Sequence, residues 1–158
     1  MTSGTRQYVL FRVGAESYGL PIGSVSGVIR WEAATPVPRA PAAVEGVINL
    51  RGRVIPVVNL AKRLLGTALT PSSHSRIVVA ESEAGAVGLA VDAALEVASI
   101  NIDDIMPPPQ TALSSETAEA FQGVVHHGDR LVILLDLDRA LPRAEYEGAQ
   151  AEQPEGEG

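Results

Sequence analysis

The chain has 158 residues, of which 46% are hydrophobic and none is cysteine. This length suits one compact unit or two small units that share a core, and the absence of cysteine excludes disulfides, thiolate metal sites and thiol nucleophiles. The net charge of −7 is unevenly distributed, because residues 1–76 carry nine Lys or Arg against three Glu, whereas residues 77–158 carry three Arg against sixteen Asp or Glu.

Strand signals dominate the first part of the chain. Residues 7–13 and 18–22 are rich in Val, Leu and aromatic side chains and flank a glycine-containing turn, which predicts a hairpin. A third strand is expected at 25–31. The segment 35–41 contains three prolines, which lack a backbone N–H, so it is predicted to be an extended connector.

A second hairpin is predicted at 44–58, where two β-rich runs flank another turn with glycine. Asn59 is a suitable N-cap for a short helix over 60–65, and Gly66 is suited to end that helix. The following loop leads into a second half that resembles the first.

Two ungapped shifts relate the halves. A shift of 69 positions places Val9, Gly19 and Val28 on Val78, Gly88 and Val97, and a shift of 77 positions places Gly46, Arg53 and Asn59 on Gly123, Arg130 and Asp136. We interpret this pattern as an internal duplication of a five-stranded unit that closes into a small barrel. The two units are expected at about 7–66 and 75–141, with terminal strands free to cross over, and they should pack together because each alone buries little area.

The two ends of the chain lie outside these units. Residues 1–6 are polar and lack the apolar core of a signal peptide, and no apolar run approaches the length that spans a bilayer. We therefore expect a cytoplasmic protein without direct membrane insertion. The acidic segment 142–158 has almost no apolar side chains and is predicted to be a disordered tail.

Candidate chemical groups do not form a convincing site. His126 and His127 are neighbours on a predicted strand and would point to opposite faces, so one metal ion could hardly use both. Asp136 and Asp138 form a carboxylate pair, but Asp136 is better explained as a helix cap. No phosphate-binding glycine motif is present. We expect no catalytic residue, no metal ion and no cofactor.

The positive charge of residues 1–76 leaves a nucleic-acid-binding small β-barrel open as an alternative. Such barrels usually interleave aromatic side chains with Lys or Arg for base stacking. Here few aromatic residues lie on predicted strands of this half, namely Tyr8, Phe11 and Tyr18, and Lys62 is its only lysine. Protein partners, without nucleic acid, are therefore the preferred expectation.

The segment 44–60, VEGVINLRGRVIPVVNL, resembles the signature of the CheW-like domain family. Further matches extend the resemblance over 7–141 in the right order, and they lie at residues 18–22, 35–38, 87–92 and 128–136. In this family the domain consists of two five-stranded SH3-like barrels around a common core. The resemblance therefore implies an all-β fold with a few short helices, forming a single domain over 7–141.

The resemblance also implies a function. It indicates a stand-alone, non-enzymatic scaffold that couples methyl-accepting chemoreceptors to a CheA-type histidine kinase in bacterial chemotaxis signalling. Such an adaptor binds the regulatory domain of the kinase and the cytoplasmic tip of the receptor. We accordingly expect a monomer in isolation that is recruited to receptor arrays at the inner membrane.

The resemblance suggests partner-binding residues as well. Arg51 matches an arginine implicated in receptor coupling and would lie at a hairpin turn, where a guanidinium can reach a partner. Five further residues match the receptor groove or its contact regions, namely Val25, Gly46, Ile77, Ala94 and Val97. Core packing is the alternative for the apolar residues, and a structural role near a bulge is the alternative for Gly46. Many family members carry a charged residue at the position of Gly27, so one polar contact expected in the family is in doubt here.

Overall fold

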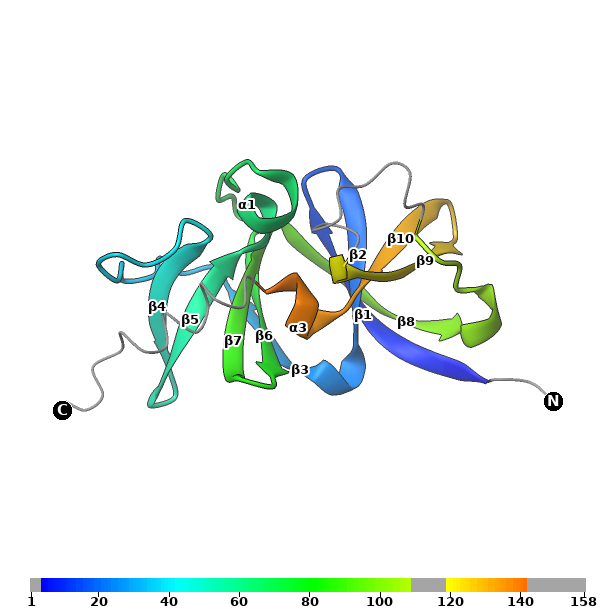
Figure 1. The fold of residues 1–158 in the computed structure, drawn as a ribbon, viewed down its shortest axis with the longest axis horizontal. Coiled ribbons are helices and arrows are strands. Elements are labelled where there is room, and N and C mark those ends of the chain that lie inside the picture. Colours follow the sequence, from blue (N-terminus) through cyan, green and yellow to red (C-terminus); the bar gives the residue numbers. More distant parts are fainter. Residues whose placement is uncertain (1–3, 109–118, 142–158) are drawn as a thin grey trace.

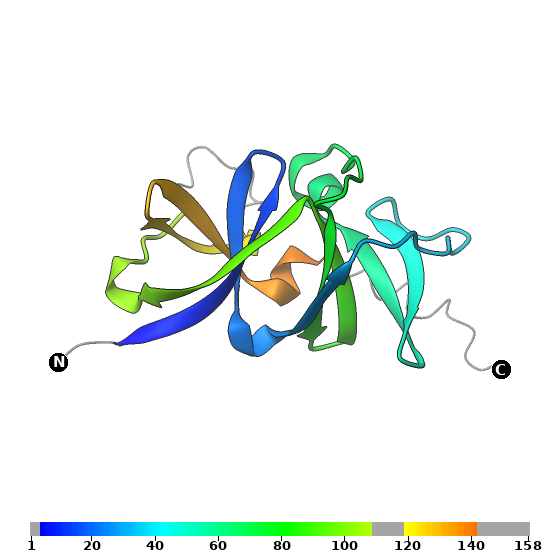
Figure 2. The same cartoon turned by 180° about the vertical axis from the view of Figure 1, so that it is seen from behind.

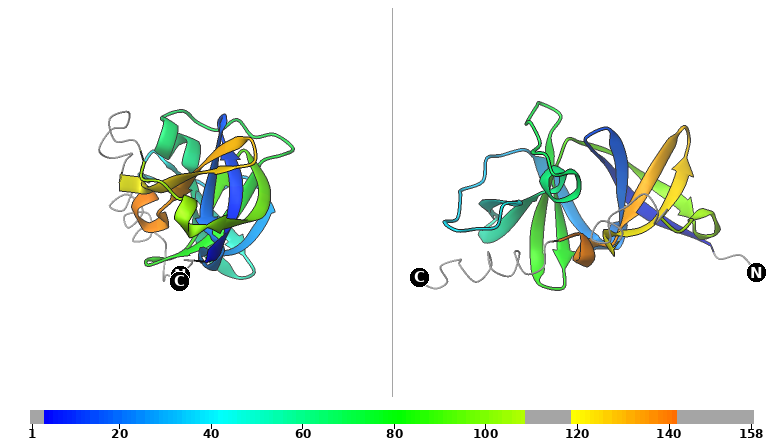
Figure 3. Two further views of the ribbon diagram at one scale, coloured as in Figure 1. Left: turned by 90° about the vertical axis from the view of Figure 1, so that its right-hand side faces the viewer. Right: turned by 45° about the horizontal axis from the view of Figure 1, so that its top comes forward.

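The computed structural model describes residues 4–108 and 119–141, which fold mainly into two five-stranded sheets. The first sheet has the spatial order β8 (Ala93–Asn101), β1 (Thr5–Val13), β2 (Glu16–Pro21), β10 (Arg130–Leu135) and β9 (Phe121–His127). The second has the order β3 (Val25–Arg30), β6 (Arg76–Ser82), β7 (Gly85–Val91), β5 (Arg53–Asn59) and β4 (Val44–Leu50). The sheets lie side by side along the long axis (Figure 1), and each curls around its own interior (Figure 3). The prediction of an all-β fold with two five-stranded barrels and a few short helices is confirmed.

The sequence predicts units at about 7–66 and 75–141 with terminal strands free to cross over, and in the structure strands of each half lie in the other sheet. The β1–β2 hairpin of the first half joins β8, β9 and β10, while the β6–β7 hairpin of the second half joins β3, β4 and β5. Each half therefore contributes its first hairpin to the other sheet. The exchanged hairpins are held in place by parallel pairing of β2 with β10 and of β7 with β5.

The strand registers of the two sheets are equivalent. Gly19 of β2 lies opposite Leu134 of β10, and Gly88 of β7 lies opposite Val57 of β5. These pairs are related by the same shifts of 69 and 77 positions that relate the two halves of the sequence. Isolated bridges also recur, between Thr35 and Val47 and between Met106 and Val124. Equivalent pairing at equivalent positions is what a duplicated unit predicts.

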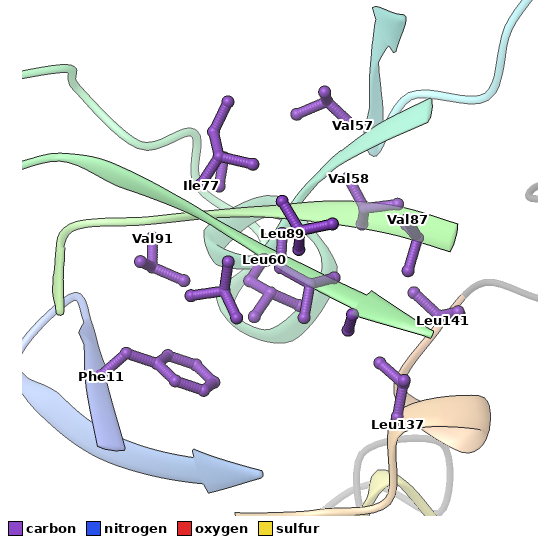
Figure 4. Close-up of a cluster of buried hydrophobic side chains, with 14 of the residues drawn as sticks. Phe11, Val57, Val58, Leu60, Ile77, Val87, Leu89, Val91, Leu137 and Leu141 are labelled. Carbon is purple, nitrogen blue, oxygen red and sulfur yellow. The ribbon is translucent and has the colours of Figure 1, made fainter. Parts of the chain in front are cut away.

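The larger hydrophobic core belongs to both barrels. It joins side chains of β1 and β2 with those of the second sheet and of the helices α1 (Leu60–Leu65) and α3 (Leu137–Ala140). Figure 4 shows Phe11 of β1 directed toward the second sheet and Leu137 and Leu141 lying near Val87. Full burial of such a side chain contributes about 1.5–3 kcal/mol. Separating the barrels would expose several of them, so the shared core holds the two barrels together.

A smaller cluster fills the interior of the first sheet, around Tyr8, Leu10 and Leu134. Burial along the strands follows their position in the sheets. The central strand β7 is buried on both faces from Ala86 to Val91, whereas the edge strand β3 alternates half-buried and exposed residues. The edge strand β3 can therefore present apolar side chains outward, as it does at Val28.

Both short helices begin at the capping residues expected from the sequence. The Oδ1 atom of Asn59 accepts a hydrogen bond from Lys62 N at 3.1 Å, and α1 ends at Gly66, whose φ is 79°. The Oδ1 atom of Asp136 accepts from Arg139 N at 3.2 Å. The predicted tail, 142–158, lies outside the described residues.

Candidate functional site

Arg51 lies at the tip of the β4–β5 hairpin. Its φ of 53° and the φ of 86° at Gly52 are both positive, which is the conformation of a two-residue type I′ turn. The side chain of Asn49 supports the turn, because its Oδ1 atom accepts a hydrogen bond from Gly52 N at 3.0 Å. Arg51 is exposed, and it has no ion pair among the described residues. Its guanidinium is therefore available to an acidic group of a partner.

A small hollow adjoins this hairpin tip, and we call it the seam hollow because it lies between the edge strand β3 and the β4–β5 hairpin. Its volume is ≈ 170 Å³, and its apolar lining comes from Ile29, Leu50 and Val79. Its charged lining comes from Arg51, Arg53 and Glu81. Arg53 Nη1 lies 3.8 Å from Glu81 Oε2, in an exposed ion pair. The hollow thus combines an apolar floor with an excess of positive charge.

Apolar side chains are exposed at positions that the duplication relates. Val28 of β3 and Val97 of β8 are 41% and 52% exposed, and Val54 of β5 and Leu131 of β10 are 49% and 43% exposed. Figure 2 shows β3 and β8 on the side of the molecule turned toward the viewer, on either side of the junction between the barrels. Exposed apolar side chains at equivalent strand positions of the two barrels offer surface for contacts with proteins.

The residues proposed for partner binding differ in how far the structure exposes them. Arg51, Ala94 and Val97 are exposed and Val25 is half-buried, so these four offer side-chain surface on β3, β8 and the β4–β5 turn. Ile77 is 0% exposed and packs in the shared core, which leaves it no surface for a partner.

Gly46 is also interior, and its role in the fold is visible. A Cβ atom at this position would lie 2.1 Å from the carbonyl oxygen of Thr35, and the φ of Gly46 is 145°. Thr35 and Val47 exchange two backbone hydrogen bonds of 2.8 and 2.9 Å at this point. Gly46 therefore allows the proline-rich connector to pair with β4, which is the structural alternative that the sequence suggested.

The exposed apolar residues Val28, Val54 and Leu131 were not singled out as binding residues from the sequence. A signal for Val28 was present, because strand alternation groups it with Ser26 and Arg30 on one face of β3. The other two could be found by applying the shift of 77 positions, which pairs them with each other. Their residue types alone do not distinguish them from core residues.

The carboxylate pair considered for chemistry, Asp136 and Asp138, has structural roles. Asp136 caps α3, and Asp138 accepts a hydrogen bond from Glu83 N at 2.8 Å. Both also line a hollow of ≈ 810 Å³, together with Arg63 and Arg139. Within residues 4–108 and 119–141, no three His, Asp or Glu side chains gather at a possible metal site.

The three aromatic residues considered for base stacking are not accessible to a nucleic acid. Tyr8, Phe11 and Tyr18 are all buried in the two cores, so none of them can stack on a base. The hairpin exchange also divides the basic first half between the two sheets. In the described part of the chain, no helix is long and apolar enough to cross a membrane.

The structure thus defines a two-barrel all-β domain with exposed apolar residues on its strands. The chain belongs to the CheW-like domain family, which it matches over residues 7–145. It is 39% identical over 149 residues to the chemotaxis protein CheW of Rhizobium meliloti, covering 94% of this chain and 96% of the relative. It is 33% identical over 150 residues to the probable chemotaxis protein CheW of Rhizobium etli, covering 94% and 96%.

A solved structure is similar as well. The crystal structure of the scaffolding protein TtCheW from Thermoanaerobacter tengcongensis aligns with a TM-score of 0.76 and 34% identity, covering 87% of this chain and 86% of that chain. Members of this family are scaffold and adaptor proteins of chemotaxis and not enzymes.

Proposed function

We propose that this chain couples methyl-accepting chemoreceptors to a CheA-type histidine kinase. In this proposal it is a cytoplasmic monomer in isolation, recruited to receptor arrays at the inner membrane. The observation that carries the proposal is the set of exposed apolar residues on β3 and β8, combined with membership of the CheW-like domain family. These strands are edges of their sheets and flank the junction of the barrels.

The receptor would bind along β3 and β8. An apolar helix face has side chains spaced at i, i+3, i+4 and i+7, and it can lie on exposed Val28 and Val97 with Ala94 and half-buried Val25 beside them. Arg51 would contact an acidic or carbonyl group at the margin of this surface. The kinase would bind elsewhere through its own regulatory domain. Simultaneous occupation of two surfaces is what allows several weak contacts to assemble a stable complex.

Isothermal titration of the chain with the regulatory domain of the kinase, and separately with a receptor-tip fragment, tests the proposal. We expect binding to each, and binding of the receptor tip to the preformed complex with the kinase domain. Val97→Asp should weaken receptor binding without changing kinase binding. Leu65→Asp is a matched control, because Leu65 is also an exposed apolar residue but lies on α1. Failure of the wild-type chain to bind either protein would overturn the proposal.

A further inference from the structure

Two arginines lie opposite each other across the strands β3 and β6. Arg30 and Arg76 are direct partners in the antiparallel register, so their side chains lie on the same face of the sheet. Like charges in this arrangement repel and destabilise the strand pair. Neither guanidinium has an ion pair among the residues that the structure describes. The second sheet therefore carries two uncompensated positive charges at this point.

The first barrel shows that the fold does not require this pair of charges. The shift of 69 positions relates Arg76 to Gln7 and Arg30 to Ser99. Gln7 and Ser99 are likewise direct partners, between β1 and β8, and both side chains are neutral. The same cross-strand position is thus filled without charge in one barrel and with two positive charges in the other. The architecture of the duplicated unit does not account for the two arginines.

A hollow of ≈ 410 Å³ adjoins the two arginines, and we call it the arginine hollow. The rest of its lining comes from Trp31, which follows β3, and from Ser72, Ser73 and Ser75 in the loop before β6. No acidic side chain of the described residues lines it. Its volume lies within the range of small-molecule sites, about 300–1,000 Å³. The charge of the arginine hollow therefore selects for an anion.

Several hydrogen-bond donors of this lining are still available. Arg76 donates from Nη1 to the backbone oxygens of Ser73 and Ser75, at 3.0 and 2.8 Å, which orients its guanidinium beside the loop. Ser75 is only 1% exposed, and its Oγ atom accepts from Ser72 N at 2.9 Å. The Oγ atom of Ser72 accepts from His74 N at 3.1 Å. Neither hydroxyl donates its proton to another described residue, so both protons can serve a ligand.

These features suit a phosphate group better than a carboxylate. A phosphate monoester carries a charge of about −1.5 to −2 and three strong acceptor oxygens, which matches two guanidinium groups and two hydroxyl donors. A carboxylate carries a single charge and would leave one arginine uncompensated. Arginine also binds phosphate through two parallel hydrogen bonds. Half-buried Trp31 adds an aromatic surface to the same hollow, on which a nucleobase can stack.

We propose that the arginine hollow binds a nucleotide, with its phosphate between Arg30 and Arg76 and its base against Trp31. The inference goes beyond the proposed coupling function and does not depend on it, because the site consists of this chain alone. Arg30 lies two residues from Val28 on the same face of β3. The nucleotide would therefore lie at one end of the apolar surface described above.

Isothermal titration of the full chain with adenosine monophosphate, inorganic phosphate and adenosine tests the inference. The adenine base is a fair probe, because stacking on an aromatic side chain tolerates any base. We expect the monophosphate to bind, inorganic phosphate to bind more weakly, and adenosine to bind weakest. The inference is overturned if the monophosphate does not bind, or if either of the other two probes binds as tightly as the monophosphate does.

The variant Arg30→Gln identifies the site. Arg30 is exposed, so its replacement removes one charge without opening the core. Affinity for the monophosphate should fall by about tenfold, and the melting temperature without ligand should not fall, because repulsion from Arg76 is relieved. Arg6→Gln is the matched control, since Arg6 is also an exposed strand arginine but lies on β1 of the first sheet. Equal affinity of the two variants for the monophosphate would refute the assignment of the site.

The fluorescence of Trp31 gives a second readout that requires no substitution. Trp31 is the only tryptophan of the chain, so its emission reports on the arginine hollow alone. Saturation with the monophosphate should quench this emission at the same concentrations at which heat is released, whereas inorganic phosphate should leave it nearly unchanged. Binding of the monophosphate without any change in emission would contradict stacking on Trp31. None of these measurements involves receptor or kinase, so a negative result leaves the proposed function standing.

Discussion

Replacing Gly46 with alanine separates a structural role of this residue from a role in partner contact. The added Cβ atom would lie 2.1 Å from Thr35 O and 2.5 Å from Thr35 C, far inside contact distance. The positive φ of 145° is a second cost, about 1–3 kcal/mol for a residue other than glycine. Relieving the collision requires the connector to move away from β4.

The magnitude of the effect follows from what this movement breaks. Thr35 and Val47 share two backbone hydrogen bonds, each with a net contribution of about 1 kcal/mol. Together with the backbone strain, the expected loss is about 3–5 kcal/mol. This is a large part of the stability of an ordinary domain, about 5–15 kcal/mol.

Urea unfolding followed by circular dichroism measures the loss. The Gly46→Ala variant should unfold at a midpoint more than about 1 M below that of the wild type. Gly27→Ala is the control, because its Cβ atom has open space and its φ is not positive; it should change stability by no more than about 0.5 kcal/mol. A Gly46→Ala variant as stable as this control, yet defective in receptor binding, would refute the structural reasoning and favour direct contact.

Three further predictions concern single side chains. Asn59→Ala removes the cap that bonds Lys62 N and should destabilise the fold by about 1–3 kcal/mol in a thermal melt; an unchanged melting temperature would show that α1 does not need the cap. Burial, followed by the charge of Glu16, raises the pKa of Tyr18 above 10.0. Because the unfolded chain then loses this proton first, stability should fall as the pH rises above 10.0, and Tyr18→Phe should reduce the slope of that fall. An identical slope in the wild type and the Tyr18→Phe variant would contradict this contribution of Tyr18. Arg51→Glu should leave the melting temperature unchanged, because the side chain is exposed at a turn, and should weaken receptor-dependent kinase activation in a reconstituted system; full activation would remove Arg51 from the binding surface.

The strands, hairpins and helix caps could be predicted because their signals are local. Asn59 and Asp136 precede short apolar helices, and the β4–β5 turn contains Gly52, which tolerates a positive φ. The duplication was also visible, since insertions between the copies are confined to the connector. Each of these features depends on residues that are close in sequence.

The exchange of hairpins could not be predicted in the same way. It depends on the pairing of Gly19 with Leu134, residues that no local pattern relates. For the same reason, the sequence could not show which apolar strand residues are buried in a central strand and which are exposed on an edge strand. Ile77 and Val97 are both β-branched strand residues, but Ile77 lies on β6 between two neighbours and Val97 lies on the edge strand β8.

The contacts between edge strands are likewise a long-range feature. Glu96 reaches His127 and Arg130 only because β8 and β9 become the two edges of one sheet. The family resemblance had already put a polar contact at Gly27 in doubt. The structure adds that Gly27 and Arg53 line an open hollow.

Reconstitution of signalling from purified components tests the coupling function most directly. Receptor-containing membranes and the kinase are mixed with increasing amounts of this chain, and the rate of kinase autophosphorylation is measured. The rate should rise with added chain to a plateau, and the rise should require receptor. A rate that does not respond to the chain, with all three proteins folded and present at saturating concentration, would contradict a coupling function.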